Sequence, residues 1–494
     1  MTEITRSNYQ ELLPEINEQI KNATFISFDA EFSGLGPPSG GIRTSLFDSG
    51  AERYQKLRSI VMQNTAPQIG FCIFRKTDDD AANVYHVDGY QAYVSEPCFA
   101  SFNNTNNVVL SLEYKCAKFL RQCNFEFNAL IERAVPYLNS KKTRDLTVYF
   151  NQHPDFIWKH PNRYFDKTFF PESERAGKHC YTSEDKVNIV KRLRGLSQIV
   201  DVIREHKIPL VGHNFALDLL YFFRMFCTEL PGNDYDTFKS LVGNFLPHVY
   251  DTKFMVLSCR KLLHSHPAYK NNQDKDKLES SSLFTAFLNT TVIGDRFCPH
   301  VEMNSTCVHF EKSLQIGRES DLEVDKNDLV HSPGFDSCIT GILFLNISHI
   351  AARIDKNFER RTGPPTLSEL LENVQSWKDQ VFISRAAVLA MYLSGNDPKP
   401  CRPRWTEATI MQKINFPVLK ESLLKLGPVD IEKINDYSFR FAAAGGKCAR
   451  QMKKLLTDEG YKIKNINIPY NKESYAVSGE LKQDGVYDRS KLLG

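Results

Sequence analysis

The N-terminal third of the chain changes from a helical to a strand-like pattern of apolar residues. Apolar side chains at helical spacing predict a helix over residues 8–22. Short apolar runs then predict strands over 24–29, 67–74 and 83–87, joined as an antiparallel meander. The stretch SGLGPPSGGIRTS after the first strand is rich in Gly, Pro and Ser, which predicts a loop or turn.

The middle of the chain alternates between helices and strands. The stretch FNALIERAVPYL predicts a helix that ends at Pro136, and the weakly periodic residues 141–185 predict a short peripheral insertion. One apolar face predicts a single helix over 187–206, and a strand over 208–213 follows it. The stretch FALDLLYFFRMF and residues 335–354 predict two more helices. Strands and helices mixed in this order predict an α/β fold with a mixed sheet.

The C-terminal part has a different pattern. The proline-rich stretch GNDPKPCRPRW predicts a linker, and a strand-helix-strand-strand-helix-strand series follows it. The predicted ranges are 409–416, 420–427, 429–434, 437–443, 447–460 and 461–468. This order predicts a small ferredoxin-like α+β domain of the RNA-recognition (RRM) type. The predicted organisation is therefore an α/β domain over 1–395, an RRM-like domain over 401–470 and a tail over 471–494.

Composition supports an ordinary globular protein with an uneven charge distribution. The chain of 494 residues is 41% hydrophobic and 24% charged, with a net charge of +3. From Cys401 to the end there are 17 basic and 11 acidic residues, which indicates either an anionic partner or simply a solvated surface. The N-terminus does not resemble a signal peptide, and no uninterrupted apolar run reaches membrane-spanning length. We therefore expect an intracellular protein with free thiols and no transmembrane anchor.

Acidic residues interrupt three apolar segments. Asp29 and Glu31 stand two apart at the end of a strand, so both point to one side, where they repel each other unless a proton or cation intervenes. Asp218 lies in an otherwise apolar helix, and Asp336 opens another, five residues after His331. Each acid also has a purely structural explanation, since acids commonly end strands and cap helices without binding a metal. Hard oxygen ligands of this kind suit Mg²⁺ or Mn²⁺.

Together these residues carry a family resemblance. The segments FDAEFSGL, ERYQKL, IGFCIF, GHNFALD, YDTKFM and GFDSCITG resemble the poly(A)-specific ribonuclease (PARN) family of DEDDh 3′→5′ exonucleases, which includes PARN-like trimmers of piRNA precursors. The resemblance spans roughly residues 5–355. It implies an RNase H-like nuclease fold of the CAF1 type for residues 1–395. PARN carries an extra nucleic-acid-binding domain, which we expect to be absent at 141–185, although Arg175 and His179 match its Arg-x3-His signature.

The resemblance also implies roles for particular residues. Two Mg²⁺ ions, with Mn²⁺ as a substitute, would be held by the four acids, and His331 would accept a proton from the attacking water. The implied catalytic set is Asp29, Glu31, Asp218, His331 and Asp336, of which the four acids are the metal ligands. The implied substrate-binding set is Phe32, Leu35, Phe119 and Lys253, with core packing as the alternative for Phe119. Asp251 is expected to be a structural acid.

The implied activity is a 3′→5′ exoribonuclease that releases 5′-mononucleotides from single-stranded RNA. Loss of the extra domain favours trimming of small RNA 3′ ends over removal of poly(A), and both remain open. Alternatives from other classes are an inactive RNA-binding scaffold and a DNA proofreading exonuclease. We expect a cytoplasmic protein, for example in RNA granules, and the nucleus is the alternative location. The expected partners are a second copy of the chain and a small-RNA-binding protein.

Aromatic residues in the C-terminal domain allow two interpretations. Tyr437, Phe439 and Phe441 alternate along its third predicted strand, where RRM domains place aromatic residues that stack on bases. The same face of an antiparallel strand can equally form the core.

Overall fold

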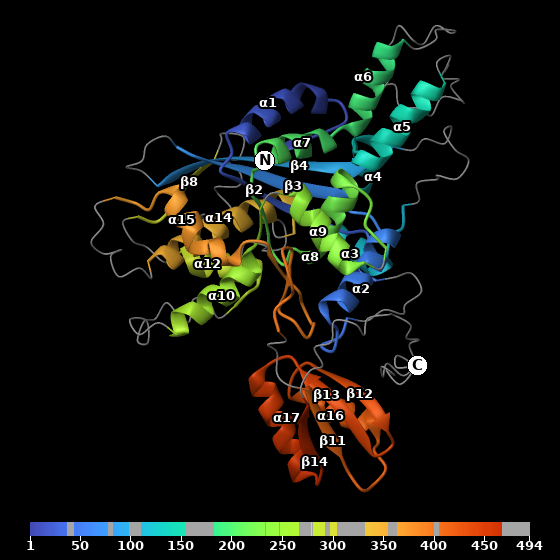
Figure 1. The fold of residues 1–494 in the computed structure, drawn as a ribbon, viewed down its shortest axis with the longest axis vertical. Helices are drawn as coiled ribbons and strands as arrows, with labels where there is room; N and C mark the ends of the chain where they lie inside the picture. The colour runs from blue at the N-terminus through green and yellow to red at the C-terminus, as the bar shows by residue number, and fades with distance from the viewer. Residues whose placement is uncertain are drawn as a thin grey trace. The chain divides into compact units, whose positions relative to one another are not determined.

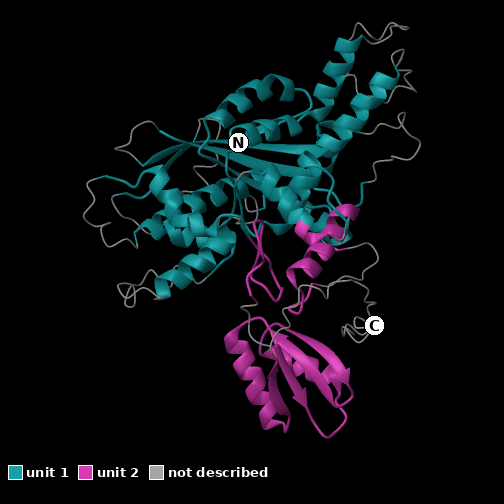
Figure 2. Cartoon of the chain, in the orientation of Figure 1, with its two compact units in different colours: residues 1–35, 64–232, 237–380 teal, residues 36–63, 233–236, 381–494 magenta. Residues whose placement is uncertain are grey.

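The computed structural model describes most of the chain, in two compact units (Figure 2). The described residues are 1–36, 44–77, 83–97, 110–153, 182–232, 234–246, 248–265, 278, 280–291, 297–303, 331–353, 363–399 and 405–466. Unit 1 comprises residues 1–35, 64–232 and 237–380, and unit 2 comprises 36–63, 233–236 and 381–494. Unit 2 therefore combines a segment from near the N-terminus with the C-terminal part. The predicted domain boundaries and insertion stay predictions, and Arg175 and His179 lie outside the described residues.

Unit 1 is built on a mixed sheet in which strands run in the order β1-β4-β3-β2-β6-β7. These strands are β1 (Thr2–Ile4), β2 (Phe25–Glu31), β3 (Gln68–Lys76), β4 (Val84–Ser95), β6 (Leu210–Gly212) and β7 (Val249–Asp251). The pairs β2–β3 and β3–β4 are antiparallel, which confirms the predicted meander. The pairs β1–β4, β2–β6 and β6–β7 are parallel, so the mixed sheet is also confirmed. The short strands β5 (Val135–Pro136) and β8 (His300–Met303) pair with β4.

Helices cover both faces of this sheet, with α1 and α7 on one side and α14, α12 and α10 on the other (Figure 1). The helices that lie in unit 1, apart from the first residues of α9, are α1 (Tyr9–Lys21), α3 (Tyr114–Gln122), α4 (Phe127–Glu132), α5 (Ser140–Gln152), α6 (Ser183–Arg194), α7 (Ser197–Glu205), α8 (Ala216–Phe222), α9 (Tyr235–Phe245), α10 (Thr252–Ser265), α12 (Leu283–Thr291), α14 (Pro333–Ala352) and α15 (Leu367–Val374). A π-helical turn, Phe223–Cys227, extends α8.

Two helix predictions were wrong for the same reason. The helix expected over 187–206 is two helices, α6 and α7, that are separated at Gly195. Gly195 has a positive φ of 42°, and an added Cβ would lie 1.9 Å from the carbonyl oxygen of Pro136. The helix expected to end at Pro136 stops at Glu132, because Val135 and Pro136 pair with β4. In both places a strand contact replaces the helical continuation that the apolar pattern predicts.

Helix α14 is the central element of the core. All of its residues from Pro333 to Ala352 are buried, and it packs against β2 and β3. Its Phe344 ring lies 4.8 Å from the Phe25 ring of β2 and 5.1 Å from the Tyr250 ring of β7. Among the described residues, only this helix is long and apolar enough to cross a membrane, and the protein buries it completely.

The N-terminus of α14 touches the sheet at a glycine. Gly70 in β3 pairs with Asp29 in β2, and a Cβ on Gly70 would lie 2.1 Å from the carbonyl carbon of Pro333. Real side chains do not tolerate such a contact, so only glycine allows the helix to approach the strand this closely. The first turn of α14, which contains Asp336, is thereby held against the strand that neighbours Asp29.

Unit 2 contains α2 (Gly50–Gln63), β10 (Ala390–Tyr392) and, after residue 404, a β-α-β-β-α-β module. The module comprises β11 (Trp405–Thr409), α16 (Phe416–Lys425), β12 (Val429–Asn435), β13 (Ser438–Ala443), α17 (Gly446–Asp458) and β14 (Lys462–Ile466). Its strand order is β12-β13-β11-β14. The first strand was predicted over 409–416 but lies at 405–409, where Trp405 is buried against Phe47. Strand β9 (Gln380–Phe382) begins at the last residue of unit 1.

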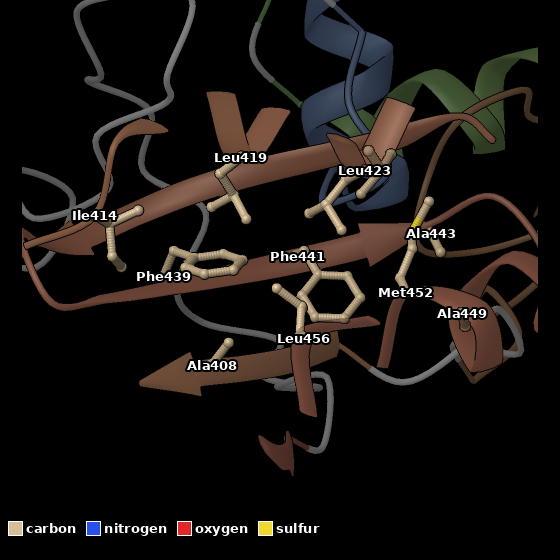
Figure 3. Close-up of a cluster of buried hydrophobic side chains, with 11 residues drawn as sticks. Ala408, Ile414, Leu419, Leu423, Phe439, Phe441, Ala443, Ala449, Met452 and Leu456 are labelled. Carbon is tan, nitrogen blue, oxygen red and sulfur yellow. The ribbon is translucent and has the colours of Figure 1, made fainter. Parts of the chain in front are cut away.

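The module's aromatic residues form its core. Phe439 and Phe441 are 0% and 1% exposed and point toward leucines of α16 and α17 (Figure 3). Of the three aromatic residues considered for base stacking, only Tyr437 is exposed. The core interpretation is therefore correct for both phenylalanines. The RNA-recognition character of the module stays a prediction.

The other face of the module's sheet is partly covered within unit 2. Trp405 and Ala442 pack there with Leu46 and Phe47. The Asp430 carboxylate accepts hydrogen bonds from the backbone N–H of Leu46, at 2.7 Å, and from the Arg385 guanidinium, at 2.8 Å. Further along this face, Arg440 pairs with Glu407. This end of the face is therefore occupied by the protein's own chain.

The contact at Gly70 generates a stability prediction. We expect Gly70→Ala to lower the free energy of unfolding by about 1–3 kcal/mol, because the added methyl group meets rigid backbone at Pro333. Gly89→Ala is the matched control in β4, since its Cβ would meet the flexible side chain of Met1. Chemical denaturation of both variants measures the difference. Equal losses in the two variants would contradict the proposed role of the Gly70 contact.

Candidate active site

Strand β2 brings Asp29 and Glu31 to one side of the sheet. They are two residues apart in a strand, so their side chains share a face. Asp29 is half-buried and Glu31 is 9% exposed. Between them, the backbone N–H of Ala30 donates a hydrogen bond of 3.1 Å to Oδ1 of Asp218. Asp218 is therefore fixed directly beside the two acids of β2.

The turn from β6 to α8 places Asp218, and Asp251 stabilises that turn. Asp251 is completely buried at the end of β7. Its carboxylate accepts hydrogen bonds from the backbone N–H groups of Asn214 at 3.0 Å, Phe215 at 2.9 Å and Lys253 at 2.9 Å. These hydrogen bonds are those expected of an acid that supports the site rather than binds a metal, and that role for Asp251 stays a prediction.

The start of α14 adds Asp336 and His331. The backbone N–H of Asp336 donates to the Ser332 carbonyl oxygen at 2.8 Å, which closes the first turn of the helix. His331 has a left-handed φ of 74°, which directs the chain sharply into that turn. Ligand-type atoms of Glu31, His331 and Asp336 all lie within 4.8 Å of one another. Residues far apart in the chain therefore meet in one place.

The pKa values of the carboxyl groups show how strongly they interact. Burial, together with the neighbouring acids, raises the pKa of Glu31 to about 9 and that of Asp218 to about 8. Burial raises the pKa of Asp336 to about 7, although a hydrogen bond from the His331 backbone opposes the rise. Burial and the charges of Asp218, Asp336 and Glu31 raise the pKa of Asp29 well above its usual value.

Four acids with such pKa values are not all ionised at pH 7 unless positive charge lies among them. Their oxygens are hard ligands, which suit Mg²⁺ or Mn²⁺ better than soft metals. A histidine nitrogen at the edge of the cluster remains available for proton transfer. The donor set therefore fits a divalent cation.

The predicted substrate-binding residues lie in different positions around the acids. Phe32 directly follows Glu31 and is half-buried, with its ring stacked on that of Tyr221 at 5.0 Å. Leu35 is 57% exposed. The Phe119 ring lies edge-to-face 4.9 Å from the His331 ring and is 39% exposed, which argues against the core alternative. Lys253 lies half-buried in the first turn of α10, beside Asp251.

Two neighbours of the site were missed by the sequence reasoning. Tyr221 lies one helical turn after Asp218 and supports the Phe32 ring, so the i, i+3 spacing could have indicated it. Cys123 follows α3, and burial together with the charges of Glu31 and Asp336 raises its pKa to about 11. Its thiol is therefore neutral at pH 7, and no feature of its sequence context marks it as a neighbour of the acids.

A profile of the CAF1 family of ribonucleases matches residues 4–344. The chain belongs to the CAF1 ribonuclease family. This membership confirms the predicted nuclease fold and the predicted relation to PARN-like enzymes, and it makes the chain a 3′→5′ exoribonuclease that acts on RNA ends.

Proteins whose sequences align with most of this chain carry ribonuclease or exonuclease names that agree with this family. The pre-piRNA 3′-exonuclease trimmer of Bombyx mori is 24% identical over 96% of this chain and 92% of its own length. The poly(A)-specific ribonuclease PARN of Xenopus laevis is 21% identical over 88% of this chain and 76% of its own length. The poly(A)-specific ribonuclease PNLDC1 of Mus musculus is 21% identical over 81% of each chain.

The solved structures that resemble this chain are more distant than these relatives. The RNase domain of yeast Pop2 has a TM-score of 0.36 and 11% identity, and it covers 71% of this chain and 86% of its own. The Mg²⁺- and Mn²⁺-bound form of S. pombe Pop2p has a TM-score of 0.28 and 14% identity, over 53% of this chain and 82% of its own.

The raised pKa values generate a prediction for the metal-free protein. A carboxyl group whose pKa is raised by folding stabilises the folded state while it is protonated, and it loses that contribution as the pH rises toward the folded pKa. With EDTA present, we therefore expect the Tm to fall from about pH 4, where these acids ionise in the unfolded chain, to about pH 9, where Glu31 and Asp218 are ionised in the folded protein as well. Mg²⁺ should restore the Tm, and more so at the higher pH.

Substitution separates this effect from general alkaline destabilisation. Glu31→Gln should flatten the pH dependence and weaken the stabilisation by Mg²⁺, as differential scanning fluorimetry can show. Glu132→Gln is the matched control, because Glu132 lies on the surface of α4. If both variants kept the wild-type pH profile and Mg²⁺ response, the acids would not be a cation site.

Proposed function

We propose that this enzyme removes nucleotides from the 3′ end of single-stranded RNA with Asp29, Glu31, Asp218 and Asp336 as ligands of two divalent cations and His331 as the general base. One observation carries the proposal: Glu31, His331 and Asp336 offer ligand atoms within 4.8 Å of one another, beside two further acids. Mg²⁺ bound there would supply the positive charge that favours ionisation of water and stabilises the departing 3′ oxygen.

The residues of the chain then have distinct tasks. His331 accepts a proton from the water that attacks the terminal phosphorus atom. Partial burial lowers the pKa of His331, so its imidazole is neutral and able to accept a proton at pH 7. The bond from phosphorus to the 3′ oxygen breaks, the 3′ oxygen takes up a proton, and a nucleoside 5′-monophosphate leaves.

Aromatic residues position the RNA end in this proposal. Phe32 is supported on one face by Tyr221, so its other side can contact a terminal base. Phe119 packs against His331, and Leu35 is exposed beyond the acids. Lys253 would neutralise a phosphate. Stacking tolerates every base, so these contacts alone do not select adenine.

For the cellular substrate we propose 3′-end trimming of small RNAs, with poly(A) removal as the second candidate. The Bombyx mori trimmer supports the first, because it matches over 92% of its own length, whereas Xenopus laevis PARN matches over 76%.

A small-RNA-binding protein would deliver the substrate in the cytoplasm, and a second copy of the chain would be a dimer partner. Retention of the four acids and His331 speaks against an inactive scaffold.

Substitution of the proposed ligands tests the chemistry. We expect Asp29→Asn or Glu31→Gln to abolish Mg²⁺-dependent release of 5′-monophosphates, and His331→Ala to slow it about 10²- to 10⁴-fold. Thin-layer or liquid chromatography of the products measures this, with circular dichroism as the check on folding. Full activity in either acid variant would disprove the assignment.

Two RNAs distinguish the proposed substrates. An RNA with an oligo(A) tail and a small RNA with a mixed-sequence 3′ extension should be shortened at similar rates if the enzyme is a trimmer. Phe32 and Phe119 give a physical reason, because aromatic contacts hold any base. Strict dependence on adenine would instead favour poly(A) removal.

A further inference from the structure

Helix α3 presents an unusual outer face next to the proposed catalytic histidine. Tyr114 at its start is 84% exposed, which makes it one of the most exposed large side chains among the described residues. Lys115, Lys118 and Arg121 are exposed as well. The helix contains no acidic residue between Tyr114 and Gln122. An aromatic ring and three cations therefore share one solvent-facing surface, which we name the α3 face.

Three contacts place the α3 face at the rim of the acid cluster. The Phe119 ring, in the middle of the helix, lies 4.9 Å from the His331 ring. At the beginning of the helix, the backbone N–H of Glu113 donates to the Ser33 carbonyl oxygen at 2.8 Å, and that of Leu35 donates to Glu113 Oε2 at 3.0 Å. The helix is thus attached to the segment that directly follows the acids of β2.

The opposite side of α3 fixes its orientation. Cys116 and Leu120 are buried, and Leu120 packs with Tyr93, Phe125 and Ala129. Positions 114, 118 and 121 follow one another at helical spacing, so they must point outward while Cys116 and Leu120 point inward. The α3 face is consequently a fixed surface of the folded protein.

The charges of the α3 face are not compensated within the described residues. Lys115, Lys118 and Arg121 form no ion pair there, while many other lysines and arginines of the chain do. The adjoining residues include the exposed Leu35, Leu110 and Leu112, and the carboxylate of the preceding Glu113 accepts a hydrogen bond from the Leu35 N–H. Exposed cations interleaved with an aromatic and apolar groups are typical of surfaces that bind single-stranded nucleic acid.

We propose that the α3 face is the track for the RNA nucleotides upstream of the 3′ end. Lys115, Lys118 and Arg121 neutralise successive phosphates, and Tyr114 stacks on a base. RNA is the occupant because the face is continuous with the acid cluster through Phe119 and carries only positive charge. The inference rests on the proposed function, since it extends the same substrate path away from the cations.

Removal of the charges tests the track. We expect Lys115→Ala/Lys118→Ala/Arg121→Ala to weaken binding of an RNA of about 20 nucleotides and to reduce the salt dependence of log K by about 2, since each lost phosphate contact removes about 0.7. KM should rise more than kcat falls, and the loss should grow with RNA length. Fluorescence anisotropy in EDTA measures binding without turnover, so the result does not depend on whether the enzyme is active.

A matched variant controls for net charge. Lys141, Arg144 and Lys191 are exposed on α5 and α6 of the same unit, and Lys141→Ala/Arg144→Ala/Lys191→Ala removes the same charge. It should retain near wild-type affinity and salt dependence. Equal weakening of RNA binding by both triple variants, or no weakening by the α3 variant, would overturn the track.

Tyr114 provides a second, uncharged test. Tyr114→Ala should weaken binding about fivefold or more, because a stacked base contributes roughly 1–3 kcal/mol. Tyr114→Phe keeps the ring and should restore binding. If the Phe variant bound as weakly as the Ala variant, stacking by Tyr114 would be disproved. A wild-type protein that bound RNA through the α3 face but did not hydrolyse it would count against the proposed chemistry alone.

Discussion

The repulsion among four carboxyl groups, three of them buried and one half-buried, is the constraint on which the rest of the site depends. Asp29, Glu31, Asp218 and Asp336 come from three separate segments, and each raises the energy of ionising the others. A cluster of this kind destabilises the metal-free fold at neutral and alkaline pH. The cluster persists only because packing elsewhere holds the three segments together. Because a bound cation would relieve the repulsion among the carboxylates, the cluster favours cation binding.

Apolar packing around α14 supplies the opposing force. The helix is buried along its whole length against β2 and β3, and Phe344 joins it to both Phe25 and Tyr250. Gly70 lets the helix start lie directly on the sheet, so Asp336 reaches the acids of β2. On the other side, the backbone N–H of Ala30 and the buried Asp251 fix Asp218. Rigid elements thus position each acid independently.

The residues around the acids fall into two groups: those proposed to contact RNA, and those that hold other side chains of the site in place. Phe32 is supported by Tyr221, His331 is packed by Phe119, and α3 carries an outward face of cations and one aromatic ring. In the C-terminal module, by contrast, the phenylalanines belong to the core and one end of the sheet is covered by residues of the same unit. The described residues therefore offer a nucleic-acid surface on α3 rather than at the module's phenylalanines.

The sequence by itself determined the meander, the helices α1 and α14, and the identity of the acids, because short-range periodicity and the spacing of Asp29 and Glu31 are local properties. It could not determine the break at Gly195, the early end of α4 or the start of β11 at Trp405, since each results from a contact with a distant strand or ring. Only the tertiary structure decided that Phe439 points inward, that Phe119 packs against His331 and that Tyr114 is exposed. Alternation specifies two faces of an element, but the packing of its neighbours decides which face meets solvent.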